Sequence, residues 1–190
     1  MRAEMTFTQY TRSLEVLPTE LALRQAVPIL SRLVRDPVFL DSHVLPLLDE
    51  PAEDWYVAYR EDLPIGSTSL QVFVWPAGTR TMIHDHACWG AFCCVVGTVF
   101  EERYERLDDG SLEDHARLKK LWQLPWSLED GISTVLPGAG GIHRVGNPTE
   151  VRAVSVHLYG PRLGELDGRD YDPSRNYVCD RPQDRWGQST

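Results

Sequence analysis

The feature that most constrains the fold is a series of short apolar segments that fills the middle of the chain and is broken repeatedly by glycine and proline. Residues 69–75 end at a Pro-Ala-Gly turn, and residues 91–100 are almost entirely apolar. Residues 151–159 form a later segment of the same kind, beyond the Gly/Pro-rich stretch 137–141. Short segments rich in β-branched and aromatic residues favour strands. The pattern predicts an all-β sandwich or barrel over residues 55–160.

The two flanking regions have a different texture. Residues 1–50 carry apolar side chains at roughly helical spacing after Pro18-Thr19-Glu20, a combination typical of a helix start. Residues 161–190 are polar, rich in Gly, Pro, Asp and Arg, and weakly patterned, so we expect an irregular tail there. A chain of 190 residues is long enough for one domain with a sizeable core. We therefore expect a single domain over residues 1–190, with N-terminal helices, a β-barrel and a tail.

Composition argues against several kinds of partner. The net charge of −9 disfavours nucleic acid and anionic membranes, because both require a basic surface. No run of about 18 apolar residues is present, and the start of the chain lacks the apolar core of a secretory signal. We expect no nucleic-acid or membrane partner, and a cytoplasmic protein that is a monomer or a weak homo-oligomer. The four cysteines do not make a disulfide framework at this length: Cys88, Cys93, Cys94 and Cys179.

Three histidines stand out from this background. His84 and His86 are two residues apart, so on a strand both imidazoles would lie on one face. His143 follows much later, just past a Pro/Gly-rich turn. Imidazole is a common ligand for zinc, iron, copper and nickel, and three histidines leave coordination positions open. We expect the fold to bring these three rings together around a metal ion.

A second group of polar side chains lies on the strand candidate 153–159. Ser155, His157 and Tyr159 share one face, and valine and leucine occupy the other. If the polar face meets solvent, the strand is simply amphipathic. If it lines a cavity, the hydroxyl, imidazole and phenol are close enough to form a hydrogen-bonded chain. The residues alone leave both possibilities open.

The surroundings of the histidines resemble the two motifs of the cupin superfamily. The flanking residues with the motif spacing are Gly78, Gly97, Gly131, Pro137 and Asn147. The glutamate ligand that usually follows the histidine pair is replaced here by Gly90 or Ala91, so three histidines remain. The resemblance implies a double-stranded β-helix, or jelly-roll, barrel with the N-terminal helices outside it.

Within that superfamily, the sequences His-Asp-His, Gly-Ile-His-Arg-Val and Ser-Val-His-Leu-Tyr resemble those of the thiol dioxygenases, the cysteine dioxygenase-like family, over roughly residues 55–160. The resemblance implies one Fe(II) per chain, held by His84, His86 and His143, with O2 as co-substrate. It implies that Ser155, His157 and Tyr159 form an outer hydrogen-bond chain, with Tyr159 nearest the iron. The implied reaction adds both atoms of O2 to a small thiol and gives a sulfinate.

Two departures from the family pattern bear on the substrate. In some members a cysteine cross-links to the relay tyrosine. Its position here is taken by Ala91, so we expect no thioether on Tyr159. Cysteine-using members have an arginine on an early strand that pairs with the substrate carboxylate, and Arg60 lies in that region. Mercaptopropionate-using members use a later arginine, for which Arg162 and Arg169 are the candidates.

These observations favour L-cysteine as the substrate, with 3-mercaptopropionate or another mercapto acid as the alternative. Two further hypotheses keep the histidines but change their use. Three histidines and a water around zinc would make a hydrolytic centre. A non-catalytic cupin would bind a small molecule through its metal without turnover. Metal content and oxygen uptake separate these hypotheses.

Overall fold

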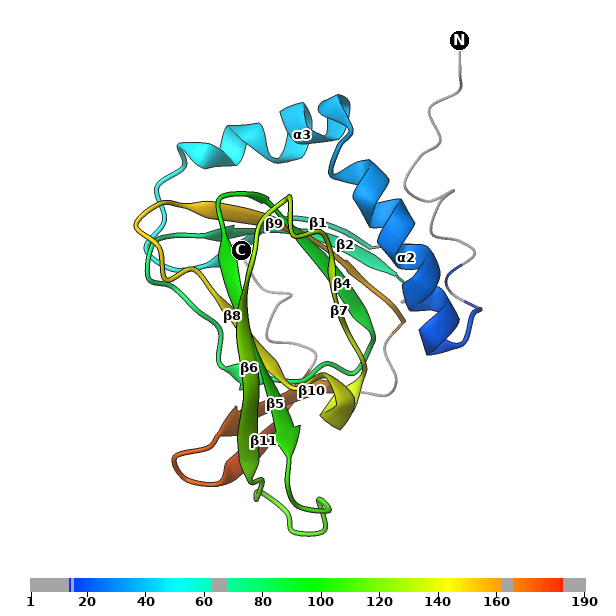
Figure 1. The fold of residues 1–190 in the computed structure, drawn as a ribbon, viewed down its shortest axis with the longest axis vertical. Coiled ribbons are helices and arrows are strands. Elements are labelled where there is room, and N and C mark those ends of the chain that lie inside the picture. The colour runs from blue at the N-terminus through cyan, green and yellow to red at the C-terminus, as the bar shows by residue number, and fades with distance from the viewer. Residues whose placement is uncertain (1–13, 15, 63–67, 162–165, 183–190) are drawn as a thin grey trace.

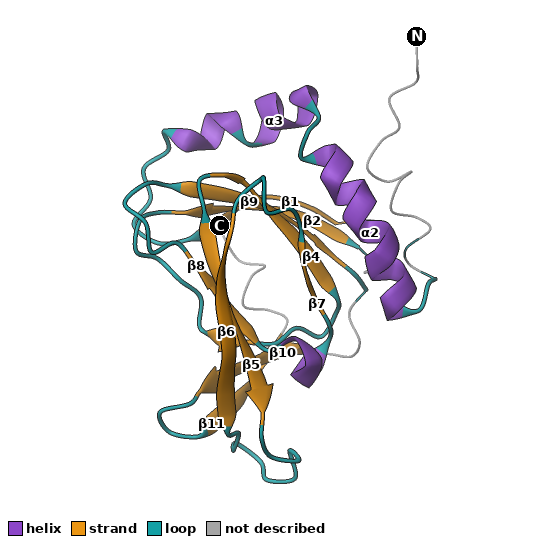
Figure 2. Ribbon diagram, viewed as in Figure 1, coloured by secondary structure: helices purple, strands orange, loops and turns teal. Residues whose placement is uncertain are grey.

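The protein is described here from a computed structural model, which describes residues 14, 16–62, 68–161 and 166–182. Two antiparallel sheets face each other, and helices lie outside one of them (Figures 1 and 2). The predicted all-β fold with N-terminal helices is confirmed. The described strands remain in two sheets and do not join into one closed barrel.

The five-stranded sheet has the order β1-β2-β9-β4-β7 and the six-stranded sheet the order β11-β10-β3-β8-β5-β6. The strands of the first sheet are β1 (Tyr56–Asp62), β2 (Ser69–Trp75), β4 (Gly90–Val96), β7 (Ser133–Val135) and β9 (Ala153–Tyr159). The strands of the second are β3 (Ile83–His84), β5 (Val99–Arg106), β6 (Leu118–Trp126), β8 (His143–Gly146), β10 (Leu166–Asp172) and β11 (Tyr177–Pro182). A 3-10 turn, η2 (Gly138–Gly141), precedes β8.

The N-terminal helices cover the outer face of the five-stranded sheet. They are α2 (Thr19–Leu33), α3 (Pro37–His43) and the 3-10 turn η1 (Leu45–Leu48). Pro28 lies inside α2, which continues through it as one helix. Asp36 starts α3 by accepting a hydrogen bond from the Val38 amide at 2.9 Å.

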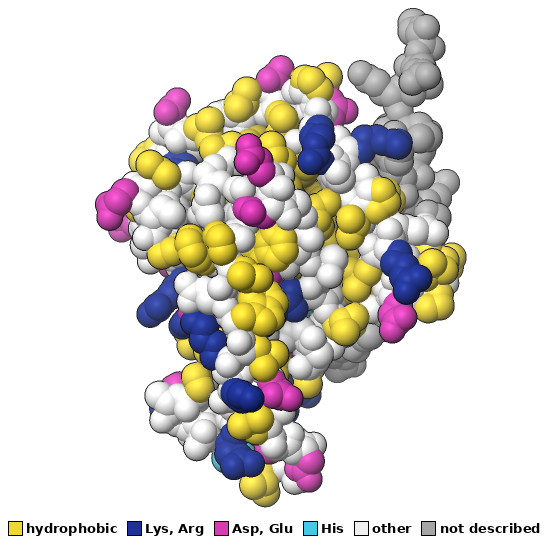
Figure 3. All heavy atoms as spheres, viewed as in Figure 1, with side chains coloured by type: hydrophobic (Ala, Val, Ile, Leu, Met, Phe, Trp, Pro, Cys, Tyr) yellow, Lys and Arg dark blue, Asp and Glu magenta, His cyan; other side chains and the backbone are white. Residues whose placement is uncertain are grey.

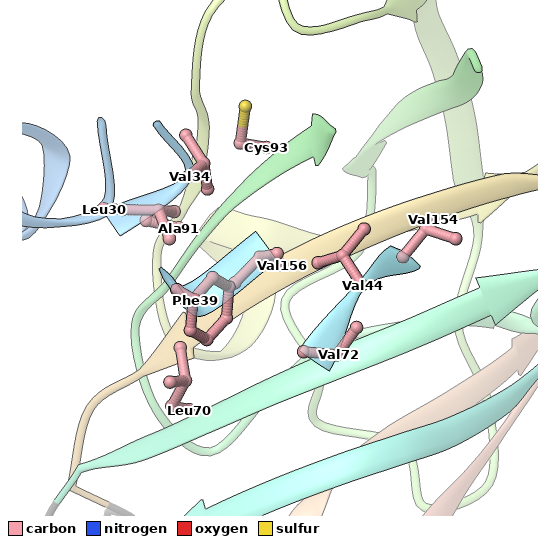
Figure 4. Close-up of a cluster of buried hydrophobic side chains, with 10 residues drawn as sticks. All are labelled: Leu30, Val34, Phe39, Val44, Leu70, Val72, Ala91, Cys93, Val154 and Val156. Atoms are coloured by element: carbon pink, nitrogen blue, oxygen red, sulfur yellow. The ribbon is translucent and has the colours of Figure 1, made fainter. Parts of the chain in front are cut away.

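Apolar side chains from these helices and from the sheet form one buried cluster, shown in Figure 4. Its members are Leu30, Val34, Phe39, Val44, Leu70, Val72, Ala91, Cys93, Val154 and Val156. Burying a side chain such as leucine or phenylalanine contributes roughly 1.5–3 kcal/mol. Because β9 alternates, packing Val154 and Val156 against the helices turns its polar residues toward the space between the two sheets.

A second apolar cluster fills part of that space and joins the sheets. Phe73, Trp75 and Phe92 come from the five-stranded sheet, and Val99 and Val145 come from the six-stranded one. All five side chains are buried. The contact fixes the separation of the two sheets near the polar face of β9.

The C-terminal region corrects the sequence analysis. The expected irregular tail is wrong for residues 166–182, because β10 and β11 pair with each other and β10 pairs with β3. Tyr171 and Val178 are buried in a cluster with Ile83 and Ile142. The apolar residues of these strands are few, so composition concealed them.

Three further observations complete the description. Among the described residues, no helix is long and apolar enough to cross a membrane. All four cysteines lie in the described part of the chain, and none of them forms a disulfide. Figure 3 shows acidic, basic and apolar side chains interspersed on one face of the molecule.

Candidate metal centre and hydrogen-bond relay

The three predicted histidines meet on the inner side of the six-stranded sheet. His84 of β3 lies directly opposite His143 of β8, and His86 follows two residues after His84. One nitrogen of each ring lies within 4.8 Å of the other two. This is the arrangement required of three ligands to a single ion, and it brings together two segments far apart in the sequence.

Hydrogen bonds fix which ring nitrogens remain free. Nδ1 of His84 lies 2.9 Å from the carbonyl of Met82, and Nδ1 of His143 lies 2.7 Å from Oε1 of Glu101. Both partners only accept, so each Nδ1 carries the hydrogen and each Nε2 presents a lone pair. Nε2 of His86 and Nε2 of His143 are 3.0 Å apart. Burial lowers the pKa of all three histidines, so their neutral, ligating forms prevail at pH 7. The donor set therefore fits a divalent transition metal.

Glu101 is a site residue that the sequence analysis missed. It is completely buried on β5, where it accepts hydrogen bonds from His143, from Ser133 Oγ at 2.6 Å and from Arg103 Nε at 2.8 Å. Burial alone would raise its pKa, but these partners hold the pKa below its ordinary value, so Glu101 is ionised. A carboxylate behind a ligand histidine fixes the ring and raises its basicity.

Its sequence context explains the omission. Glu101 opens a charged stretch that continues to Asp114 and looks like a solvated hairpin. The only available signal was alternation, because Val99, Glu101 and Arg103 share one face of β5.

The segment between the first two histidines is held from the C-terminal side. Asp85 is buried; its Oδ1 accepts the Arg169 amide and its Oδ2 accepts the Tyr171 hydroxyl, both at 2.7 Å. Its own amide donates to the Arg169 carbonyl at 3.0 Å. Asp85 therefore ties His84 and His86 to β10, which explains an acidic residue between two ligands.

The predicted relay exists, and it faces the interior. Ser155 Oγ lies 2.7 Å from His157 Nε2, and His157 Nδ1 lies 3.1 Å from the Tyr159 hydroxyl. The Tyr159 ring also contacts the His86 ring, with centroids 5.2 Å apart. The relay strand belongs to one sheet, whereas His84 and His143 belong to the other and His86 lies in the loop between β3 and β4. The relay therefore ends at the candidate metal centre across the inter-sheet space.

Trp75 is a fourth member of the relay, which the sequence analysis did not identify. Its Nε1 donates to Ser155 Oγ at 2.7 Å. Among the described residues, Ser155 Oγ has hydrogen bonds only with Trp75 and His157. Since indole can only donate, the Ser155 hydrogen is directed to His157 Nε2. His157 then carries its hydrogen on Nδ1 and donates to Tyr159.

This direction leaves the Tyr159 hydroxyl hydrogen available to a ligand at the metal centre. Burial raises the pKa of Tyr159 above its ordinary value, so the phenol stays protonated. Burial lowers the pKa of His157 to about 3, so the imidazole stays neutral. The relay is thus a chain of neutral donors with one defined polarity.

The residue beside the relay tyrosine is Gly90 and not Ala91. A Cβ at Gly90 would lie 3.0 Å from Cε1 of Tyr159. Ala91 faces the opposite way, into the helix-covered cluster. The expectation that Ala91 occupies the cross-linking position is therefore wrong in detail. The absence of a thioether stays a prediction, supported by a glycine at the contact.

The predicted arginines have different surroundings. Arg60 lies opposite Gln71, which lies opposite His157, so it shares the relay face. Its Nε is 2.8 Å from Asp62, and its side chain is 33% exposed. Arg169 pairs with Asp180 at 3.0 Å and is 44% exposed. Arg162 lies outside the described residues.

These features define a class: a two-sheet β protein with a three-histidine metal centre and a Trp-Ser-His-Tyr relay. The family model for cysteine dioxygenase type I matches residues 51–172. The chain therefore belongs to the cysteine dioxygenase type I family of thiol dioxygenases. The match extends beyond the segment 55–160 that carried the resemblance and includes β10.

Solved structures with similarity to the chain include a protein from Thermus thermophilus, at 15% identity and a TM-score of 0.42, covering 62% of this chain and 94% of that one. A cupin 2 conserved barrel domain protein from Salinispora arenicola has 18% identity and a TM-score of 0.37, covering 54% and 72%. An oxalate oxidase in complex with glycolate has 15% identity and a TM-score of 0.39, covering 50% and 42%.

Proposed function

We propose that the protein is a non-haem Fe(II)-dependent thiol dioxygenase with one iron per chain, held by His84, His86 and His143. Its substrate is a small thiol that bears a carboxylate, L-cysteine in the first place, and its product is the sulfinate. The observation that carries the proposal is the convergence of three neutral imidazoles with a relay that presents a phenol hydroxyl. We further propose a cytoplasmic location, which four cysteines without a disulfide support.

The reaction balances without another redox partner. Both oxygen atoms of O2 form bonds to sulfur, which loses four electrons while O2 gains four, and the thiol proton leaves. The iron, when bound, supplies the site at which thiolate and O2 meet. Three neutral ligands leave its positive charge available to an anionic thiolate.

The residues of the chain supply orientation and proton control. The Tyr159 hydroxyl donates a hydrogen bond to the bound reactants, and His157 holds that hydroxyl by donating to its oxygen. Trp75 and Ser155 fix the tautomer of His157. Phe73 and Phe92 pack on the His157 ring, with centroids 4.4 and 5.0 Å away, and keep water from it.

The proposal is tested by oxygen uptake and metal analysis on purified protein. We expect iron at about one equivalent per chain and consumption of one O2 per cysteine, with sulfinate as product. His143→Ala should lose metal and activity together, whereas Tyr159→Phe should keep the metal and slow or uncouple oxygen use. Zinc with no oxygen uptake would support a hydrolytic centre, and tight thiol binding without turnover would support a non-catalytic role.

Parallel kinetics with 3-mercaptopropionate test the choice of thiol. A higher kcat/KM for 3-mercaptopropionate than for L-cysteine would overturn that choice while leaving the reaction class intact. The Arg60 guanidinium already meets Asp62 through Nε, so a substrate carboxylate has to compete with Asp62 for its charge. Arg60→Gln should then raise the KM for carboxylate-bearing thiols.

A further inference from the structure

A largely enclosed arginine that the sequence analysis did not single out lies beside the candidate metal centre. Arg181 of β11 pairs with Gly168 of β10, and Asp170, two residues further along β10, pairs with His84. Residues paired across antiparallel strands point to the same face, as do residues two apart on one strand. The Arg181 side chain therefore lies on the face of the sheet that carries His84.

Gly168 allows this arrangement. Its φ is +136°, and a Cβ there would lie 2.2 Å from the carbonyl oxygen of Asp85. Any other residue would push β10 away from the segment that carries the first two histidines. Because Gly168 has no side chain, the Asp85 backbone packs directly against β10 at this position. The Arg181 side chain extends past Gly168 toward the same segment.

The guanidinium of Arg181 is only partly neutralised by its contacts. Nη2 donates to the carbonyls of Asp85 at 2.9 Å and Asp167 at 3.1 Å, and Nη1 donates to Asp170 Oδ1 at 3.2 Å. Two of these three acceptors are neutral. Nε is buried and has no hydrogen-bond partner among the described residues, and the side chain is 11% exposed.

Arg181 differs in its contacts and exposure from the two described arginines that the sequence indicated as carboxylate anchors. Arg60 and Arg169 each meet a carboxylate through Nε, and both are at least three times more exposed. Exposure to water screens a charge, and burial preserves it.

We propose that Arg181 supplies the fixed positive charge by which the metal centre selects thiols that carry a carboxylate over neutral or cationic thiols of the same size. The inference rests on the proposed function for its substrate class. A divalent ion with three neutral ligands and a nearby guanidinium favours a ligand with two negative charges, a thiolate and a carboxylate.

The test compares L-cysteine with cysteamine, which differ only by the carboxylate. Dissociation constants are measured by calorimetry under argon on metal-loaded protein, so no turnover is needed. Arg181→Gln should weaken cysteine binding on the order of 10-fold relative to cysteamine, as expected for loss of a charged partner. Arg181→Lys should retain most of the preference, because it keeps the charge.

A second variant keeps the proposal testable if Arg181→Gln does not fold. Asp170→Asn removes the only charged group among the hydrogen-bond partners of Arg181 described above and should increase the preference for cysteine. If either variant has wild-type metal content and its dissociation constants for cysteine and cysteamine change by the same factor, the proposal is overturned. Arg181 would then serve only to hold the Asp85 segment in place. If wild-type protein binds cysteine more tightly than cysteamine but consumes no O2, the proposed dioxygenase function is wrong. The proposed selection of carboxylate-bearing thiols by charge would still hold.

Discussion

Oε1 of Glu101 lies 2.7 Å from Nδ1 of His143, so a buried, ionised carboxylate stands one hydrogen bond behind a proposed metal ligand. The sequence lacks the usual glutamate ligand after the histidine pair. Glu101 does not replace that glutamate, because its carboxylate faces Nδ1 of His143 and not the Nε2 that would bind the metal. It tunes the ligand instead of occupying a coordination position.

Glu101→Gln should therefore weaken metal binding about 10- to 100-fold while keeping the fold, because an outer carboxylate orients the ring and raises its basicity. Competition with a chelator of known affinity measures the effect. Glu102→Gln is the matched control, since Glu102 is the next residue and points to the other face, where it pairs with Arg144 and Lys120. Equal metal affinity in the two variants would contradict the role given to Glu101.

Trp75→Phe should slow oxygen use about 5- to 10-fold with little change in the KM for the thiol, because loss of one neutral hydrogen bond costs about 1 kcal/mol. The phenylalanine leaves Ser155 free to rotate, so His157 can adopt the other tautomer and take the Tyr159 hydrogen. Steady-state oxygen uptake measures the change. Trp55→Phe, which replaces an indole in the same stack of rings, is the control for loss of an indole away from Ser155. A Trp75→Phe rate equal to that of the control would remove Trp75 from the relay.

Gly90→Ala should impair catalysis without unfolding the protein. The new Cβ would lie 2.9 Å from Cγ2 of Val135 and 3.0 Å from Cε1 of Tyr159, so a neighbour must shift by a few tenths of an ångström. We expect Tyr159 to move, and kcat to fall while metal content stays at the wild-type level. Gly140→Ala is the control for a glycine replacement away from the tyrosine, because the new Cβ there would approach the exposed side chain of Leu136, at 3.3 Å. Full activity in Gly90→Ala would show that the tyrosine position is not critical.

The metal-free protein should lose stability as the pH falls below about 6.5. The pKa of His157 is about 3 in the folded protein, so the unfolded chain takes up a proton first when acid is added. Stability from this group is complete above about pH 6.5 and decreases by about 1.4 kcal/mol per pH unit below it.

Urea unfolding at about pH 7 and about pH 5.5, on either side of the ordinary histidine pKa, checks this prediction with chelator present. His157→Phe removes the titrating imidazole and keeps an aromatic ring between Phe73 and Phe92, which pack against His157. The decrease in the free energy of unfolding between the two pH values should be about 1 kcal/mol smaller in the variant. Identical decreases would mean that His157 is not buried as a neutral imidazole.

The sequence predicted the parts of the site that follow from local spacing. His84 and His86 lie two apart beside a turn, and Ser155, His157 and Tyr159 alternate on one strand, so their faces could be inferred before their surroundings. The helices outside the β fold were also predictable, because residues 19–33 show apolar residues at helical spacing.

The parts that were missed depend on contacts between distant segments. Glu101 and Trp75 are site residues because of what lies across from them. Alternation along residues 99–103 was the single local sign of Glu101, and no local pattern marks Trp75. β10 and β11 hold few apolar residues, and their place is set by pairing with β3 and by the contacts of Asp85. Arg181 becomes a neighbour of His84 only through that pairing.

The relay tyrosine stands on one sheet and two of the proposed metal ligands stand on the other. The sheets are joined by the hydrogen bond from Ser133 to Glu101 and by apolar side chains between them. Phe92, Val99 and Val145 are apolar side chains that pack between the two sheets and set their separation. Adding or removing one methyl group there would lengthen or shorten the reach of the Tyr159 hydroxyl. The distance between the Tyr159 hydroxyl and the candidate metal centre therefore depends on the apolar side chains between the sheets as much as on the polar groups.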